Sequence, residues 1–156
     1  MIDPPQIVRS PAQQTAVIRF TIPREDMPTI MGAAIKELLA VIGAQDAGPA
    51  GPMYTFHHRN PSDTFDFDVG FPVSKPIAPA GRVQPGQIPS ATVARTIYRG
   101  GYEGLGSAWG EFMGWIKANG HVAAETLWER YLSGPESGDE ASAWQTELNR
   151  PLSGQD

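Results

Sequence analysis

The sequence predicts an α+β fold in which two β-α-β-β units, related by a pseudo-twofold axis, form one antiparallel sheet with two helices on one face and a central cleft. Three observations lead to this fold: one strongly alternating strand pattern, two amphipathic helix patterns, and a second appearance of the same element order at an offset near half the chain. Two such units can share one sheet with both helices packed on the same side.

The first repeat covers about residues 6–74 and opens with a β-rich segment at residues 8–22. From Met27 to Ile42, apolar residues recur every three or four positions, which predicts an amphipathic helix. Gly43 follows this pattern and is suited to end the helix. A strand followed by a helix is the first half of the repeated unit.

Two further strands complete the first repeat. Residues 53–58 predict a short strand, and residues 64–73 predict a longer one. In the longer segment, apolar side chains alternate with the polar Asp66 and Asp68. Side chains of a strand point to opposite faces in turn, so this segment is predicted to bury one face and expose the other.

The second repeat, about residues 81–152, shows the same order of elements. An extended segment ends at residues 91–98, a helical pattern covers residues 102–119, and two strands follow at residues 126–132 and 144–152. Residues 75–87, rich in Pro and Gly, are expected to link the repeats, and residues 153–156 are expected to form a flexible tail. We therefore expect a single domain over residues 1–152.

Composition narrows the classes of function. The chain has 156 residues and a net charge of −5, which disfavours nucleic-acid phosphates and anionic membranes as partners. It contains no cysteine, which excludes disulfides, thiolate nucleophiles and zinc–thiolate sites. The N-terminus does not resemble a signal peptide, and no segment approaches the roughly 20 apolar residues of a membrane span. Cytoplasmic localisation is the default expectation.

Glu129 is the most informative candidate site residue. It lies between aromatic residues, directly after Trp128 and two positions before Tyr131, with which it shares one strand face. A strand carboxylate often lies on the solvent side, and that interpretation stays open from the residues alone. A glutamate beside aromatic rings in a cleft can also bind a cation through its charge and the ring quadrupoles together.

Further candidates could line the same cleft or fill the core. They are Tyr54, Phe56, His58, Tyr102, Trp109, Trp115 and the second carboxylate, Glu147. We expect Tyr54 and Phe56 to face the cleft because their strand is the first-repeat counterpart of the Glu129 strand. No metal is expected, because the three histidines are scattered and His57 and His58, adjacent on a strand, point to opposite faces. No cofactor is expected either.

The second half of the chain resembles the GyrI-like domain, the effector-binding domain of AraC-type and multidrug-sensing MerR-type regulators. The resemblance rests on residues 98–105, on Trp128-Glu129-Arg130-Tyr131-Leu132, and on the ending Trp144-Gln145-Thr146-Glu147-Leu148-Asn149-Arg150-Pro151-Leu152. It implies a ligand cleft that the acidic residue of the E-x-Y motif faces; here that residue is Glu129. The regulators carry a DNA-binding module in addition, and this chain is similar to the stand-alone form.

Three hypotheses for function follow. The first is the binding of an amphipathic, possibly cationic, small molecule. The second, which the resemblance implies, is hydrolysis of a strained, cyclopropane-bearing electrophile with Glu129 as general acid or base and Tyr131 assisting. The third, also implied by the resemblance, is a protein-binding module of the gyrase-inhibitor type. The identity of the ligand, its turnover and the oligomeric state stay open at this point.

Overall fold

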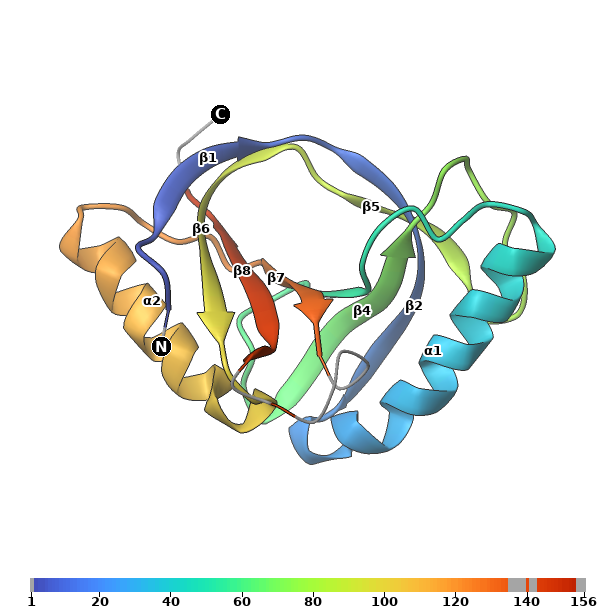
Figure 1. Cartoon of the computed structure of the whole chain (residues 1–156), viewed down its shortest axis with the longest axis horizontal. Coiled ribbons are helices and arrows are strands. Elements are labelled where there is room, and N and C mark those ends of the chain that lie inside the picture. The colour runs from blue at the N-terminus through green and yellow to red at the C-terminus, as the bar shows by residue number, and fades with distance from the viewer. Residues whose placement is uncertain (1, 135–139, 141–142, 154–156) are drawn as a thin grey trace. The chain divides into compact units, whose positions relative to one another are not determined.

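The computed structural model describes residues 2–134, 140 and 143–153 (Figure 1). Contacts divide the chain into two compact units. We call residues 11–90 the N-terminal unit, and residues 1–10 together with 91–156 the C-terminal unit. Most of the predicted turn after Gly134 and of the predicted tail lies outside the described residues.

The N-terminal unit contains four strands, a short 3-10 turn and one helix. In chain order these are β2 (Gln13–Pro23), η1 (Arg24–Asp26), α1 (Met27–Ala44), β3 (Tyr54–His57), β4 (Thr64–Pro72) and β5 (Gln84–Ile88). The strands are all antiparallel and follow the order β5-β2-β4-β3.

The core of the N-terminal unit lies between α1 and one face of its sheet. Ala34, Leu38 and Ile42 of α1 are fully buried, as are Phe67 and Val69 of β4. The buried helix residues stand four positions apart, so they fall on one side of the helix. The buried apolar residues of β4 stand two positions apart, as the alternation of residues 64–73 predicted. The prediction that the other face is exposed is wrong, because Asp66 on that face is only 4% exposed.

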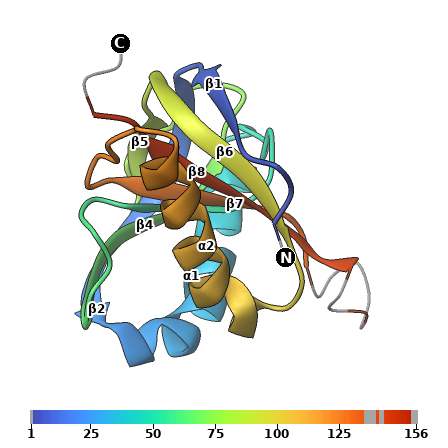
Figure 2. The ribbon, with the colours of Figure 1, turned by 90° about the vertical axis from the view of Figure 1, so that its left-hand side faces the viewer.

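The described residues of the C-terminal unit form a matching set of elements. These are β1 (Gln6–Ser10), β6 (Ala91–Arg99), η2 (Tyr102–Gly104), α2 (Leu105–Ala118), β7 (Leu127–Ser133) and β8 (Gln145–Pro151). The strands pair antiparallel in the order β1-β6-β8-β7. Figure 2 shows the N-terminal segment running along β6, where Ile2 forms an isolated bridge with Tyr98.

A second core lies between α2 and the sheet of the C-terminal unit. Ala108, Phe112 and Ile116 form the buried side of α2 and pack against Ala94 of β6 and Leu148 of β8. The predicted α+β class, with antiparallel strands and one helix in each half, is confirmed.

Strand pairing brings segments that are distant in sequence together within each unit. β1 pairs with β6 of the C-terminal unit, from Gln6 opposite Arg95 to Ser10 opposite Ala91. β5 pairs with β2, so part of the expected linker at residues 75–87 is a sheet strand rather than a connection. Composition alone suggested a linker because Pro85 and Gly86 are poor strand residues; both are tolerated here because β5 is an edge strand.

The two helices end differently. Gly120 follows α2 with a φ of +78°, a conformation that glycine adopts without strain. Gly43 lies inside α1, which continues to Ala44, so its expected role as the helix end is wrong. The first residue with positive φ after α1 is Asp46, at +53°. Asp tolerates this region better than most residues because its side chain can bond locally.

Residues 24–44 are, by length and composition alone, long and apolar enough to cross a membrane, with a mean hydropathy of 1.4. This differs from the expectation that no segment comes near that length. The helix of this segment nevertheless buries Ala34, Leu38 and Ile42 against the sheet of its own unit. Only 17% of the most apolar window of this segment is buried, so α1 packs on its sheet along one side.

Candidate functional site

Glu129 lies on β7 and faces α2. The strand register sets it opposite Leu148, which belongs to the core beneath α2. Side chains directly opposite each other in an antiparallel pair lie on the same face of the sheet, so the Glu129 carboxylate is on the helix side. Only 8% of the residue is exposed, and a buried carboxylate requires hydrogen-bond donors around it.

Two aromatic residues supply such donors. The indole Nε1–H of Trp109, on α2, donates to Glu129 Oε2 at 2.6 Å, and the hydroxyl of Tyr131 donates to Oε1 at 2.7 Å. Tyr131 reaches the carboxylate because residues two apart on a strand share a face. Both donors are neutral, so these bonds orient the carboxylate without cancelling its charge.

The aromatic surface continues outward from Tyr131. The ring of Tyr102, in η2, lies 5.9 Å from the Tyr131 ring at 79°, and 5.2 Å from the Trp144 ring at 44°. Tyr102 is 39% exposed, so this end of the cluster reaches solvent. We call Glu129, Trp109, Tyr131, Tyr102 and Trp144 the Glu129 cluster. It lies wholly within the C-terminal unit.

A short turn fixes the position of Tyr102. Gly100 has a φ of +148°, and a side chain on it would collide with the ring of Tyr98. The hydroxyl of Tyr98 donates to the carbonyl oxygen of Gly101 at 2.8 Å, which ties the turn to β6. Tyr102 follows directly as the first residue of η2. The two glycines therefore position an aromatic side chain beside Tyr131.

The second predicted carboxylate, Glu147, does not join this cluster. It lies opposite Arg130 on the sheet face away from α2, where its Oε1 accepts from Arg130 at 2.8 Å and from the amide of Asn149 at 2.9 Å. Arg95 lies 3.5 Å from the same oxygen, and burial lowers the pKa of this arginine. The two carboxylates therefore occupy opposite faces of one sheet.

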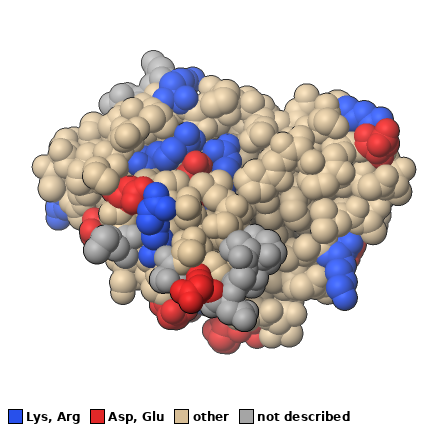
Figure 3. Space-filling view, viewed as in Figure 1, with Lys and Arg blue, Asp and Glu red and all other residues tan. Residues whose placement is uncertain are grey.

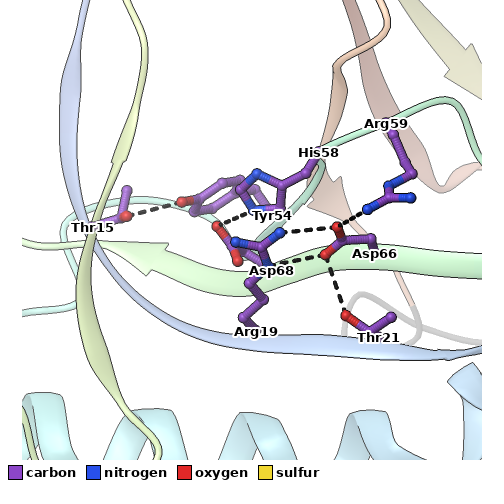
Figure 4. Close-up of polar contacts among 8 residues, drawn as sticks. All are labelled: Thr15, Arg19, Thr21, Tyr54, His58, Arg59, Asp66 and Asp68. Carbon is purple, nitrogen blue, oxygen red and sulfur yellow. Dashed lines mark hydrogen bonds and ion pairs between the residues drawn. The ribbon is translucent and has the colours of Figure 1, made fainter.

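Tyr54, Phe56 and His58, which were also expected to face the cleft, lie on the face of the N-terminal sheet away from α1. Figure 4 shows Tyr54 and His58 on this face. Tyr54 is buried and its hydroxyl donates to Thr15 Oγ1 at 2.9 Å. His58 Nε2 lies 3.0 Å from Asp68 Oδ2, and its ring meets Phe56 edge-on at 5.2 Å.

The same face of the N-terminal unit carries an ionic cluster around Asp66. Arg19 donates from Nε and Nη2 to the two oxygens of Asp66, both at 2.9 Å, and Arg59 approaches Oδ2 at 3.3 Å. These contacts, chiefly the hydrogen bonds from Arg19, hold the pKa of Asp66 below its ordinary value. The Asp66 carboxylate thus forms a structural ion pair that links β2 and β4.

The strand register explains why Glu129 lies on the helix side of its own sheet and Tyr54 on the side of its sheet away from α1. Tyr54 lies opposite Gly70, two residues before Pro72 at the end of β4. Trp128 lies opposite Asn149, two residues before Pro151 at the end of β8. By this register, Tyr54 corresponds to Trp128, and the counterpart of Glu129 is Thr55. The sequence analysis matched the two strands but not their residues, and a shift of one residue moves a strand side chain to the other face.

The remaining predicted residues are separated from the carboxylate. Trp115, on α2, stacks on His121 at 6.3 Å and lines an open cavity beside Pro4 and Glu111. His57 is buried against Phe67. Among the residues that the structure describes, no group of three or more His, Asp or Glu side chains is arranged to hold a metal ion. Trp144 was not among the candidates, although it stands in the motif that carries the resemblance.

Charges of both signs are mixed on the molecular face seen in Figure 3. Lys and Arg lie close to Asp and Glu, and most of the visible surface belongs to other residues. Ion pairs of exposed side chains in the structure include Arg82 with Glu37, at 2.8 Å, and Arg99 with Asp3, at 3.0 Å.

The family model described as the GyrI-like small molecule binding domain matches residues 3–152. The chain belongs to this family. It is therefore a GyrI-like small-molecule-binding domain, as the resemblance of its second half implied. No curated protein matches the chain.

Solved structures share the GyrI-like fold at low sequence identity. EcmrR in a complex with DNA has a TM-score of 0.79 and 18% identity over 97% of this chain, which spans 57% of that EcmrR chain. The isolated C-terminal domain of EcmrR has a TM-score of 0.75 and 21% identity, covering 96% of both chains.

Two further relatives extend the comparison. SAV2435 bound to tetraphenylphosphonium has a TM-score of 0.70 and 10% identity over 97% of this chain and 95% of its own. A hydrolase from Listeria innocua has a TM-score of 0.67 and 11% identity over 96% of this chain and 91% of its own. At these identities the likeness shows the fold alone.

Proposed function

We propose that this GyrI-like domain binds lipophilic cations on the aromatic surface of the Glu129 cluster, with Glu129 as the charge partner. The observation that carries the proposal is the buried Glu129 carboxylate, held between Trp109 and Tyr131 at 2.6 and 2.7 Å. A negative charge backed by aromatic rings attracts a cation through Coulomb forces and through the ring quadrupoles.

The shape of the cluster supports an amphipathic ligand. Tyr102, 39% exposed, and the half-buried Trp144 and Tyr131 offer ring surface to an apolar body, and the carboxylate lies at the inner end. Ligand sites in proteins usually combine an apolar wall with few polar groups. One relative supports the same ligand class, because the SAV2435 structure contains tetraphenylphosphonium, a lipophilic cation.

The test replaces Glu129 by glutamine and measures binding of tetraphenylphosphonium through the change in tryptophan fluorescence. Glu129→Gln keeps the shape and an acceptor oxygen but removes the charge. A cation some 5–6 Å from a carboxylate, at an effective dielectric constant of about 20, gains roughly 3 kcal/mol. Allowing for partial screening, we expect a loss of about 1.5–3 kcal/mol, or roughly tenfold to 150-fold in affinity.

Glu147→Gln is the matched control. It removes the same charge from the same sheet, but on the face away from α2. We expect this variant to bind tetraphenylphosphonium within about threefold of the wild type, since nearby charges on the far face are partly screened. Equal affinity of wild type and Glu129→Gln, with unchanged melting curves, would remove Glu129 from the binding determinant and contradict the proposal.

Hydrolysis is the second candidate, favoured by the 2.7 Å hydrogen bond between Tyr131 and Glu129 and by the fold shared with a hydrolase. Glu129 would take a proton from water while the water oxygen attacks a carbon of an activated cyclopropane. The electron pair of the broken carbon–carbon bond would pass to the neighbouring carbon, which gains a proton. Ring-opened product formed by the wild type and not by Glu129→Gln would favour the enzyme; binding without turnover favours the simple binder.

A further inference from the structure

The hydrogen bonds of Glu129 restrict how a ligand can use its charge. Each carboxylate oxygen already accepts a short bond from a side chain, one from Trp109 and one from Tyr131. With 8% of the residue exposed, little of the carboxylate is within reach of a group arriving from solvent. A ligand on the aromatic surface therefore meets ring carbon first and the carboxylate charge behind it.

The hydrogen bonds that Tyr131 and Trp109 donate to Glu129 also strengthen the attraction between their rings and a cation. An O–H or N–H that donates to a carboxylate is polarised, which raises the electron density of the attached ring. Cation–π attraction comes from the negative ring face, so the phenol of Tyr131 and the indole of Trp109 gain from this polarisation. The charge of Glu129 thus reaches a ligand mainly through space and through the two rings.

Ligand cations differ in how many hydrogen bonds to water they lose when they bind to such an aromatic surface. A primary ammonium carries three N–H donors that are hydrogen-bonded in water, and ring faces replace those bonds poorly. A quaternary ammonium or phosphonium ion has no N–H group, so it brings the same charge without that loss. Building on the proposed function, we propose that the Glu129 cluster selects cations that lack hydrogen-bond donors over primary ammonium ions of similar size and charge.

The experiment compares two probes that share a naphthalene ring. These are N,N,N-trimethyl-1-(2-naphthyl)methanaminium and 2-naphthylmethylammonium, titrated by calorimetry at pH 7, where both carry one positive charge. We expect the quaternary probe to bind at least about tenfold more tightly, the factor that corresponds to one lost charge-assisted hydrogen bond. 2-Naphthylmethanol, the neutral probe, should bind more weakly than the quaternary probe.

A variant separates this mechanism from a simple difference in ligand bulk. Tyr131→Phe keeps the ring but frees Oε1 of Glu129 from the 2.7 Å bond with the phenol. The space that the hydroxyl filled then opens toward Oε1, and an ammonium can donate to this oxygen, so the ratio of the two affinities should fall severalfold. Tyr54→Phe also loses one hydroxyl, but in the N-terminal unit, where that hydroxyl bonds to Thr15. It should leave the ratio unchanged.

The outcomes are distinct. Equal binding of the two cations, or tighter binding of the ammonium, overturns the selectivity. In either case the proposed function still stands if Glu129→Gln weakens the binding of both cations. Failure of both cations to bind overturns the proposed function and the selectivity together. A ratio of tenfold or more that Tyr131→Phe leaves unchanged also contradicts the proposal, because the preference would then come from ligand bulk. A large ratio that this variant reduces supports it.

Discussion

The helix-side faces of the two sheets carry different chemistry on the same order of elements. In the C-terminal unit this face holds Glu129 and Tyr131, bonded to each other. At the register counterparts, the N-terminal unit has Thr55 and His57, and His57 stacks on Phe67 at 5.4 Å and 23°. One face therefore contains a carboxylate held by aromatic donors, and the other is an apolar and aromatic core.

The two helices also carry different side chains at the position of α2 that contacts Glu129 and at the corresponding position of α1. Leu38 and Phe112 are the middle buried residues of α1 and α2, and three positions earlier stand Ile35 and Trp109. An isoleucine side chain has no N–H group to offer, whereas the indole of Trp109 donates to Glu129. A buried charge is tolerated where donors converge on it, so carboxylate and indole have to be present together.

Charge in the N-terminal unit lies on the opposite face. Asp66 and Asp68 point away from α1 and are paired with arginine or histidine side chains. The pairing of Asp66 with Arg19 is ionic, whereas the donors Trp109 and Tyr131 to Glu129 are neutral. The comparison teaches that one scaffold can use its acidic residues in two ways: as ion pairs that hold strands together, and as an oriented charge beneath aromatic rings.

The strongest test of this difference moves a carboxylate to the N-terminal unit. Thr55 is fully buried on the helix side of its sheet, opposite Val69 of the core. Thr55→Glu should lower the free energy of unfolding by about 3–5 kcal/mol at pH 7, the cost of a buried charge without adequate partners. Urea denaturation measures this loss, and Thr55→Gln, of the same size without charge, should lose less.

The pH dependence of the same variant sharpens the test. Burial raises the folded-state pKa of the new carboxyl above its unfolded value, about 4.3 for glutamate. The folded state then binds more protons between these two pKa values, so stability falls as pH rises through that window. Thr55→Glu should therefore approach Thr55→Gln in stability at about pH 4. Equal stability of the two at pH 7 would show that this face accepts a carboxylate as readily as the Glu129 face.

Local sequence patterns were sufficient for the elements. The alternation in residues 64–73 and the spacing from Met27 to Ile42 reflect geometry within one strand and one helix, and both elements form as predicted. The period of two likewise placed Glu129 and Tyr131 on one face, where they are hydrogen-bonded. These features depend on residues close in sequence, which a single chain displays directly.

Pairing between distant segments was the part that local patterns could not supply. Which residue of the Tyr54 strand corresponds to Glu129 depends on the strand register, and the register depends on the turns and bulges of each unit. β7, for example, has an irregularity between Tyr131 and Ser133. The contact of Trp144 with Tyr102 joins the start of β8 to the start of α2, and nothing in either segment alone indicates it.

An intermediate loss of stability is expected when the ionic cluster around Asp66 in the N-terminal unit is broken. Asp66→Asn removes the charge that accepts two hydrogen bonds from Arg19. Because Arg19 is 57% exposed, solvent screens the pair, and we expect a loss of about 1–2 kcal/mol at pH 7. Glu37→Gln, in the exposed pair with Arg82, should lose much less.

The sign of the pH effect follows from the depressed pKa of Asp66. The folded pKa lies below the ordinary value of 3.8, so the carboxylate stabilises the fold above that pH and loses this contribution as pH falls further. The difference between wild type and Asp66→Asn should thus be constant near neutrality and shrink below about pH 4. A difference that grows on acidification would rule out the ion pair as its source.

The smallest expected effect tests whether Tyr54 serves the fold rather than the ligand. Tyr54 is 1% exposed, and its hydroxyl donates to Thr15, itself 2% exposed, across the sheet of the N-terminal unit. Tyr54→Phe keeps the ring and removes this bond, which should cost about 1 kcal/mol of unfolding free energy. Its affinity for tetraphenylphosphonium should equal that of the wild type, because the hydroxyl faces away from α1 and the Glu129 cluster lies wholly in the other unit. Thermal melts and fluorescence titrations of the same samples give both quantities. A normal melt with weakened binding would return Tyr54 to the ligand-binding residues and would place part of the site in the N-terminal unit.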